Sequence, residues 1–102
     1  MKGISIVVKI DPELEDIVPG YIDRRKREIS DIWDAYNKRD YPALQVFGHK
    51  LKGNAGGYGL DHIGALGSEI EVAAKDKSDS KIEHALQELD DYLQHLSVTF
   101  DA

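Results

Sequence analysis

The chain has 102 residues, a formal net charge of −6 and no cysteine. This length corresponds to a single domain, residues 1–102, with one modest hydrophobic core. The acidic balance argues against nucleic-acid binding, and no apolar run is long enough to cross a membrane. Without cysteine there is neither a disulfide nor a thiolate metal site, so we expect a cytoplasmic protein.

The first ten residues predict an extended arm rather than a helix. Ile4, Ile6, Val8 and Ile10 alternate with the period of two that is typical of a strand. No second strand is evident in the sequence, and a lone strand is not stable. We expect residues 1–10 to lie as an arm on a monomeric domain, the alternative being that they pair within a dimer.

Residues 11–102 predict an up-and-down, antiparallel helical bundle, so the expected fold class is all-α. Apolar residues at three- and four-residue spacing mark each helix, and the links between helices are short. A short extra helix precedes a four-helix core. The expected helices, in chain order, cover roughly residues 12–18, 20–38, 42–57, 61–74 and 80 to near the C-terminus.

Start signals support these helices. Asp11 precedes a proline and is expected to cap the first helix, and Asp40 and Asp61 are expected to cap the third and fourth. The pair Ser80 and Glu83 matches a capping box for the last helix. Each signal places a helix start two to four residues before the first apolar residue of its stripe.

The second helix contains the basic run of the chain, residues 24–27, which is flanked by Asp23 and Glu28. Mixed charges of this kind are typical of the solvated side of a helix. We therefore expect these side chains to face solvent, rather than to form a nucleic-acid patch.

One stretch of the third helix, residues 48–59, carries a histidine, two lysines and five glycines. Glycine costs about 1 kcal/mol relative to alanine inside a helix, so its repeated use indicates a requirement for access. At about 100° per residue, an apolar stripe lies opposite His49. Its members are Leu44, Phe47, Gly48, Leu51, Ala55 and Tyr58. The face that we expect around His49 holds Gln45, Val46, Lys52, Gly53 and Gly56.

Four interpretations of this histidine compete. An ordinary exposed histidine would leave the neighbouring Lys52, Gly53 and Gly56 unexplained. A metal site is disfavoured because no histidine has an acidic residue three positions before it or a second histidine four positions away. A phosphate-binding loop is disfavoured because the lysine and hydroxyl residues that should follow its second glycine are missing.

The fourth interpretation is a nucleophilic histidine that carries a phosphoryl group. Neutral imidazole is a nucleophile at cellular pH. Lys52, one turn after His49, would offset the negative charge of the phosphoryl group. Gly53 and Gly56 would leave room for a partner's active site to reach the ring. This interpretation accounts for every residue on the face.

Two motifs carry a resemblance to a known family. They read His49-Lys-Leu-Lys52-Gly53-Asn-Ala-x-x-Tyr-Gly59 and Leu66-Gly67-x-x-Ile70-Glu71-x-Ala73-Ala74. Together they resemble the histidine-containing phosphotransfer (HPt) domain, the phospho-carrier of two-component phosphorelays. The likeness extends to Asp11-Pro12-x-Leu14 and Val18-Pro19-x-Tyr-Ile22-x-x-Arg25, and so covers nearly the whole chain.

The nearest confusable class is the dimerising phospho-acceptor domain of histidine kinases. That class typically has an acidic residue after the histidine and a proline a few positions on. Lys50 follows the histidine here and no proline is near, which argues against that class.

The resemblance implies roles for individual residues. His49 would be the phospho-acceptor, Lys52 would steady the phosphoryl group and Gly53 would permit docking. In the variant of this domain found in chemotaxis kinases, a glutamate on the next helix helps to orient the histidine. Glu71 matches that position, whereas Ser68 stands where that variant has a second histidine. The alternative for Glu71 is an ordinary solvated helix residue.

The resemblance also implies a function. The chain would accept a phosphoryl group from a histidine kinase, including a hybrid kinase, or from the aspartyl phosphate of a receiver domain. It would pass the group to a response-regulator receiver domain. We expect no turnover of its own and no cofactor or metal, because the receiver brings the Mg²⁺. The alternative is a helical adaptor that docks receivers or kinases without being phosphorylated.

Overall fold

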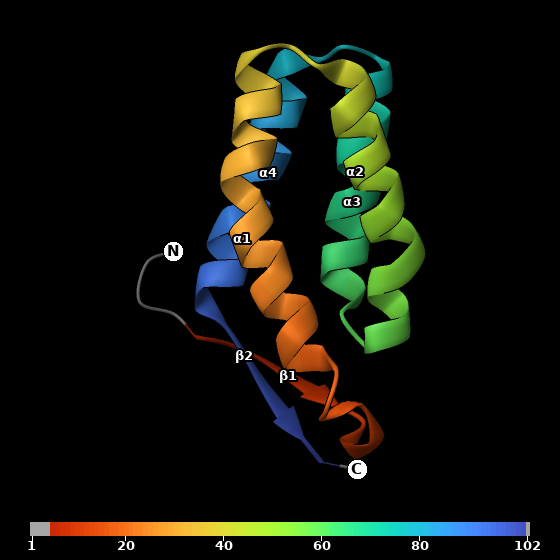
Figure 1. Cartoon of the computed structure of the whole chain (residues 1–102), viewed down its shortest axis with the longest axis vertical. Helices are drawn as coiled ribbons and strands as arrows, with labels where there is room; N and C mark the ends of the chain where they lie inside the picture. The colour runs from red at the N-terminus through yellow and green to blue at the C-terminus, as the bar shows by residue number, and fades with distance from the viewer. Residues whose placement is uncertain (1–4, 102) are drawn as a thin grey trace.

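The computed structural model describes residues 5–101, which are mostly helical, with four α-helices and a small two-stranded sheet. The start of the predicted arm, including Ile4, and the final Ala102 lie outside the described residues. In chain order, the elements are β1 (Ile6–Ile10), the 3-10 helix η1 (Pro12–Leu14), α1 (Val18–Asn37), α2 (Tyr41–Asn54), the 3-10 helix η2 (Ala55–Tyr58), α3 (Asp61–Lys75), α4 (Asp79–His95) and β2 (Leu96–Phe100). The sheet lies at the end of the molecule where α1 begins and α4 ends (Figure 1).

The expectation of an arm without a partner strand is wrong, and the residues after the last helix form a strand that was not predicted from the sequence. The arm supplies β1, which pairs in parallel with β2, Ile6 lying opposite Leu96 and Ile10 opposite Phe100. The last helix ends at His95, where β2 takes over. Apolar and small hydroxyl side chains alternate along β2, so one face of the strand is partly buried against the core and the other is exposed. The sheet therefore ties the two ends of the chain together.

Two predicted cap residues are confirmed. The Asp11 side chain accepts a hydrogen bond from the backbone of Glu13 at 2.9 Å, and Asp40 accepts one from the backbone of Ala43 at 3.2 Å. Gly59 follows η2 with φ of 76°, the left-handed conformation that glycine adopts without strain. Asp40 and Gly59 define the two ends of the segment that contains His49.

The other two caps are wrong by one or two residues. Leu60 is the N-cap of α3, so Asp61 is the first helical residue. Likewise Ser78 is the N-cap of α4, so Ser80 lies within the helix and forms no capping box. The Asp79 carboxylate accepts a hydrogen bond from Tyr41, the first residue of α2, at 2.7 Å and one from Arg39 of the α1–α2 connection at 3.1 Å. These contacts place the start of α4 against the start of α2.

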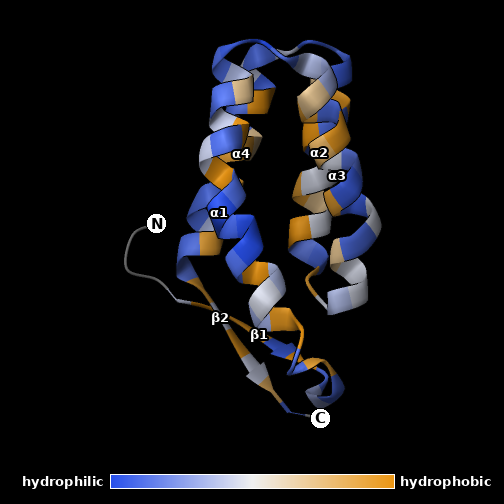
Figure 2. Cartoon of the chain, viewed as in Figure 1, coloured by the Kyte–Doolittle hydropathy of each residue, from blue (hydrophilic) through white to orange (hydrophobic). Residues whose placement is uncertain are grey.

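The core lies between the helices. In Figure 2, apolar and hydrophilic residues form alternating bands along the helices, as expected when one side of each helix is buried. Burying such a side chain contributes about 1.5–3 kcal/mol relative to leaving it exposed. The largest fully buried side chains are Ile10, Val18, Leu44, Leu51, Leu60, Ile63, Leu66, Ile70, Ile82, Leu86, Leu89 and Leu93.

The close approach of α2 and α3 depends on two glycines. A Cβ atom added at Gly48 would lie 2.5 Å from the Gly67 carbonyl oxygen and 2.6 Å from the Glu71 amide nitrogen. A Cβ atom at Gly67 would lie 2.5 Å from the Leu51 Cβ and 2.8 Å from the Gly48 carbonyl oxygen. No side chain fits at either position. Because His49 follows Gly48 directly, this crossing sets the distance between the histidine and α3.

Candidate functional site

His49 lies on the exposed side of α2, as its position opposite the apolar stripe predicts. Its side chain is 71% exposed, whereas Leu44, Phe47 and Leu51 on the opposite side are buried. Two and a half turns of regular helix separate its position from the capped start at Asp40, which fixes the direction of the side chain. The imidazole ring is therefore accessible to a macromolecular partner.

Glu71 reaches the ring from α3. Its Oε2 atom lies 2.9 Å from His49 Nδ1, and its Oε1 atom lies 3.7 Å from Lys52 Nζ. The Glu71 side chain is only 20% exposed, so most of it is covered by the protein rather than by solvent. The Glu71 carboxylate thus contacts both the imidazole of His49 and the ammonium group of Lys52.

This contact determines which ring nitrogen is available. An ionised carboxylate only accepts hydrogen bonds, so His49 Nδ1 is the donor in the contact with Glu71. In the neutral imidazole the lone pair then lies on Nε2. Within residues 5–101, no hydrogen bond or ion pair involves His49 Nε2. The arrangement presents a nucleophilic nitrogen to solvent.

The two glycines predicted beside His49 are both exposed. A Cβ atom at Gly53 would meet nothing within 4 Å, and one at Gly56 would meet only Asp61 Oδ1, at 3.7 Å. Gly56 belongs to η2, because α2 ends at Asn54. Neither glycine is required by internal packing, in contrast to Gly48. Because these two residues have no side chain, no atoms project from the helix surface at these positions.

Gln45 and Val46 lie one turn before His49, on the other side from the glycines. Together with Pro42, Lys50 and Glu71, they and His49 line a shallow depression of about 490 Å³. Val46 is 53% exposed, so it contributes apolar surface to the rim of this depression. Gln45 and Val46, two of the three predicted docking residues, therefore line the same depression as His49, whereas Gly56 does not.

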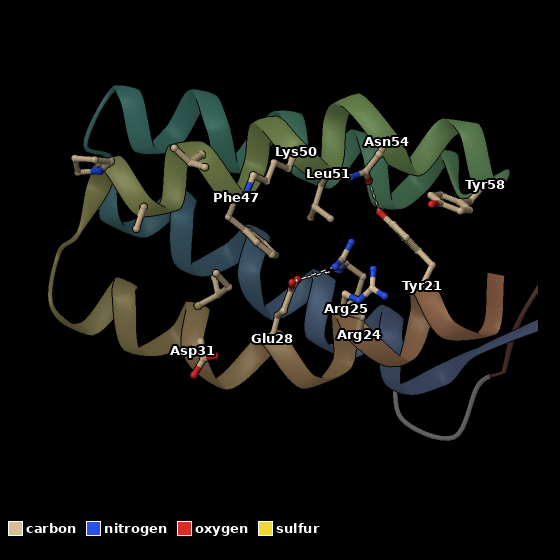
Figure 3. Close-up of a pocket in the computed structure, with 14 residues that line it drawn as sticks. Tyr21, Arg24, Arg25, Glu28, Asp31, Phe47, Lys50, Leu51, Asn54 and Tyr58 are labelled. Carbon is tan, nitrogen blue, oxygen red and sulfur yellow. Dashed lines mark hydrogen bonds and ion pairs between the residues drawn. The ribbon is translucent and has the colours of Figure 1, made fainter. Parts of the chain in front are cut away.

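A larger groove between α1 and α2 was not predicted from the sequence. Its volume is about 690 Å³, and Figure 3 shows side chains of the two helices facing one another across it. It is lined by Tyr21, Arg24, Arg25, Glu28, Asp31, Ile32, Pro42, Ala43, Val46, Phe47, Lys50, Leu51, Asn54 and Tyr58. The residues from α1 recur at intervals of three and four, which is a signal that the sequence does contain.

The expectation that the basic run is wholly solvated is wrong for Arg25. This residue is 9% exposed, and its guanidinium lies 4.6 Å from the centre of the Tyr21 ring. Glu28 pairs with it, at 2.8 Å from Nε and 3.1 Å from Nη2. A buried charge requires such a partner, because the isolated ion would lose its hydration. The other three basic residues of the run are exposed.

Tyr21 connects the groove to the end of α2. Its ring stacks on Tyr58 with centroids 4.3 Å apart, and its hydroxyl donates a hydrogen bond to Asn54 Oδ1 at 2.6 Å. Burial raises the pKa of Tyr21 above the ordinary value of 10.0. The phenol is therefore neutral at physiological pH and keeps its proton for this hydrogen bond.

The remaining histidines lie away from this face. His62 Nε2 and His84 Nε2 contact the two oxygens of Glu88 at 3.4 and 3.6 Å. Among residues 5–101, no group of three or more histidine, aspartate and glutamate side chains is arranged to hold a metal ion. In the same range, no helix has both the length and the apolar character that crossing a bilayer requires.

Comparisons with protein-family models, with curated proteins and with solved structures found no match to this chain. The assignment of function therefore depends on the geometry of the site and on the resemblance of the motifs.

Proposed function

We propose that the chain is a phosphorelay carrier that accepts a phosphoryl group on His49 and passes it to a receiver domain. The observation that carries this proposal is the contact of His49 Nδ1 with Glu71 at 2.9 Å on an exposed ring, which leaves Nε2 free. Lys52 lies one turn on, and its ammonium group is 3.7 Å from the same carboxylate. A nucleophile, an orienting group and a cation are together on one face.

The transfer balances without any further reactant. The Nε2 lone pair attacks the phosphorus atom of an aspartyl phosphate, a P–N bond forms, and the P–O bond to the aspartate breaks. The aspartate leaves as a carboxylate. The proton on Nδ1 stays, and the cationic ring that results lies against the negative charge of Glu71. Transfer to the next receiver is the reverse of this step, with the carboxylate of that receiver as the nucleophile.

The fold supports the same proposal. We assign the helices to an up-and-down bundle of the HPt type. In support, Figure 1 draws the α1–α2 and α3–α4 connections at one end and the α2–α3 connection at the other. The carrier has no turnover of its own and works in the cytoplasm as a monomer, with Mg²⁺ held by the receiver. Kinases and receivers are its partners.

The experiment is a transfer assay with the full chain. The chain is incubated with a phosphorylated receiver domain or with an autophosphorylated histidine kinase, and the label on the chain is tested for stability in acid and in alkali. A phosphohistidine is labile in acid and stable in alkali. Binding of the receiver with no label on the chain, for every donor tried, would favour the unphosphorylated adaptor instead.

Lys52→Ala is expected to slow transfer into the chain, or to shorten the lifetime of the phospho-form, by about ten- to a hundredfold, since one charge-assisted contact contributes about 1.5–3 kcal/mol. Lys52 is 56% exposed, so its ion pair with Glu71 adds only about 0–1 kcal/mol to stability. The melting temperature should therefore stay close to that of the wild type. Unchanged transfer kinetics and lifetime would remove the role of Lys52.

Glu71→Ala is expected to release the ring. With no acceptor for the Nδ1 proton, the neutral histidine should shift towards the tautomer protonated on Nε2, in which the lone pair lies on Nδ1 and Nε2 is no longer nucleophilic. We expect transfer to slow by about tenfold, which corresponds to about 1.4 kcal/mol. The ¹⁵N shifts of the His49 ring report the tautomer independently of activity. An unaltered tautomer in this variant would contradict the orienting role of Glu71.

A further inference from the structure

The sheet formed by β1 and β2 is small for a parallel sheet. It holds two strands of five residues each at one end of the molecule (Figure 1). Parallel strands usually belong to larger sheets that are covered on both faces, and an isolated pair of strands is at best marginally stable. Here one face packs on the core through side chains such as Ile10 and Val98, whereas the other face is exposed. The sheet therefore has room for a further strand.

The outer edges of the sheet are open in the part of the chain that the structure describes. Within residues 5–101, residues 6–10 and 97–100 form no backbone hydrogen bond outside the β1–β2 pair. Among the described elements, only β2 runs alongside β1. Neither strand contains a proline, a residue that blocks pairing at many natural edges. The amide and carbonyl groups that point outwards are available to an extended segment.

The exposed face of β1 offers an apolar contact to such a segment. Val7 is 60% exposed, although the residues on either side of it in the strand are partly buried. The other exposed residues on this face of the sheet, Lys9, Ser97 and Thr99, are polar. Side chains that point to the same face on neighbouring strands contact one another. An apolar side chain on a strand added beside β1 would therefore cover Val7.

The surroundings of the sheet are strongly acidic. Residues 5–17 and 96–101 together carry five exposed carboxylates and one lysine, a formal charge of −4 within a chain of −6. The four carboxylates that follow β1 are Asp11, Glu13, Glu15 and Asp16. None of the five forms an ion pair with a cation of residues 5–101. Charge complementarity therefore selects a basic segment.

We propose that the edge of β1 binds an extended basic segment of a partner protein, which adds a third strand to the sheet. The inference goes beyond the proposed function, because the site includes no residue of the face around His49. Backbone hydrogen bonds along the edge supply affinity, and alternating basic and apolar side chains supply selectivity. A partner held at this end of the bundle leaves His49 accessible, and its effective concentration near the ring is raised.

A second copy of the chain fits this edge less well. Pairing between two β1 strands would bring the same carboxylates of both copies together, and their repulsion opposes the contact. A nucleic acid is disfavoured by the same negative charge. The acidic surroundings thus act against pairing between copies and in favour of a basic segment.

The test uses two synthetic peptides of equal charge. In the first, lysine alternates with valine. In the second, proline replaces the valines, which removes backbone donors and prevents strand pairing. Each peptide is titrated into the ¹⁵N-labelled full chain, and amide shifts and hydrogen exchange are measured. Glu13→Lys, next to β1, is compared with Glu69→Lys, which makes the same change in net charge at an exposed residue of α3.

We expect the lysine–valine peptide to shift the amides of β1 and to slow hydrogen exchange at alternate residues of that strand by about tenfold, because their N–H groups gain a partner. The proline peptide should protect none of them. Glu13→Lys should weaken binding by about threefold to tenfold at low salt, and Glu69→Lys by less than about twofold. The difference should shrink at high salt, because screening weakens exposed charges.

Equal shifts with both peptides would show charge attraction without strand addition, and would overturn the proposal. New protection confined to elements other than β1 would also overturn it. A mass that doubles with concentration, together with β1 amides that are protected before any peptide is added, would assign the edge to a second copy instead. None of these measurements involves phosphoryl transfer, so failure of this proposal is distinguishable from failure of the proposed function.

Discussion

Gly48→Ala is expected to destabilise the fold by about 1–3 kcal/mol, towards the upper end of the range for an overpacked core. The added methyl group would lie 2.5 Å from the Gly67 carbonyl oxygen and 2.6 Å from the Glu71 amide nitrogen. Both neighbours are backbone atoms of α3, which cannot move aside as a flexible side chain can. The two helices must separate, and the contact between His49 and Glu71 should lengthen.

Gly53→Ala is the matched control on the same helix. Nothing lies within 4 Å of a Cβ atom at this position, so the variant should be more stable by up to about 1 kcal/mol. The free energy of unfolding from urea denaturation, followed by circular dichroism, measures both changes. Equal effects of the two substitutions would show that α2 and α3 do not cross at Gly48.

His49→Gln is expected to abolish phosphoryl transfer to the chain, because an amide is not a nucleophile that can form the phospho-intermediate. The fold should be unaffected, since the side chain is 71% exposed and no apolar contact is lost. Glutamine also keeps a donor near the Glu71 carboxylate. Incubation with a phosphorylated receiver, followed by intact-protein mass measurement, gives the result directly.

His84→Gln provides the control for the chemistry of an exposed histidine. His84 is 77% exposed and, like His49, lies beside a glutamate, with Nε2 3.6 Å from Glu88. In contrast to His49, His84 is not followed by a lysine one helical turn later, and no glycine lies on the same face of its helix. This variant should be labelled at the wild-type rate. Labelling that depends on His84 rather than on His49 would contradict the assignment of the site.

Much of the candidate site was predictable from the sequence because it lies on one regular helix. The period of α2 places His49 opposite the buried stripe without any knowledge of tertiary structure. The contact with Glu71 is different, because it joins two helices. Its position in the motif suggested a role, but only the close crossing at Gly48 and Gly67 brings the carboxylate to 2.9 Å from the ring.

The C-terminal strand shows where periodicity misleads. Leu96 follows Leu93 by three residues, so it continues the apolar stripe of α4 as well as beginning the alternation of β2. The partner strand β1 is more than eighty residues away in the sequence, and its pairing decides between the two conformations. A local pattern does not contain that information. Two features of the sequence did point to the strand: no glycine or asparagine marks the end of α4, and apolar and polar residues alternate after it.

The burial of Arg25 was also not predictable from the charge pattern of the sequence. A charge run on a helix is typical of a solvated face, and three of its four members do face solvent. Arg25 is buried because Tyr21 and Glu28, one turn away on either side, supply a ring face and a carboxylate. The separation of α1 from α2 that opens the groove follows from packing elsewhere, on α3 and α4. No stretch of sequence encodes that separation by itself.

The most direct test of the central claim is the position of the phosphate on the isolated phospho-form. The chain is labelled with ¹⁵N in its histidines, phosphorylated by a receiver domain, and studied by ³¹P and ¹⁵N NMR. The geometry predicts one phosphorus bonded to His49 Nε2, with Nδ1 still protonated and donating to Glu71. A phosphate on Nδ1, on another histidine or on a hydroxyl or carboxyl side chain would contradict the account.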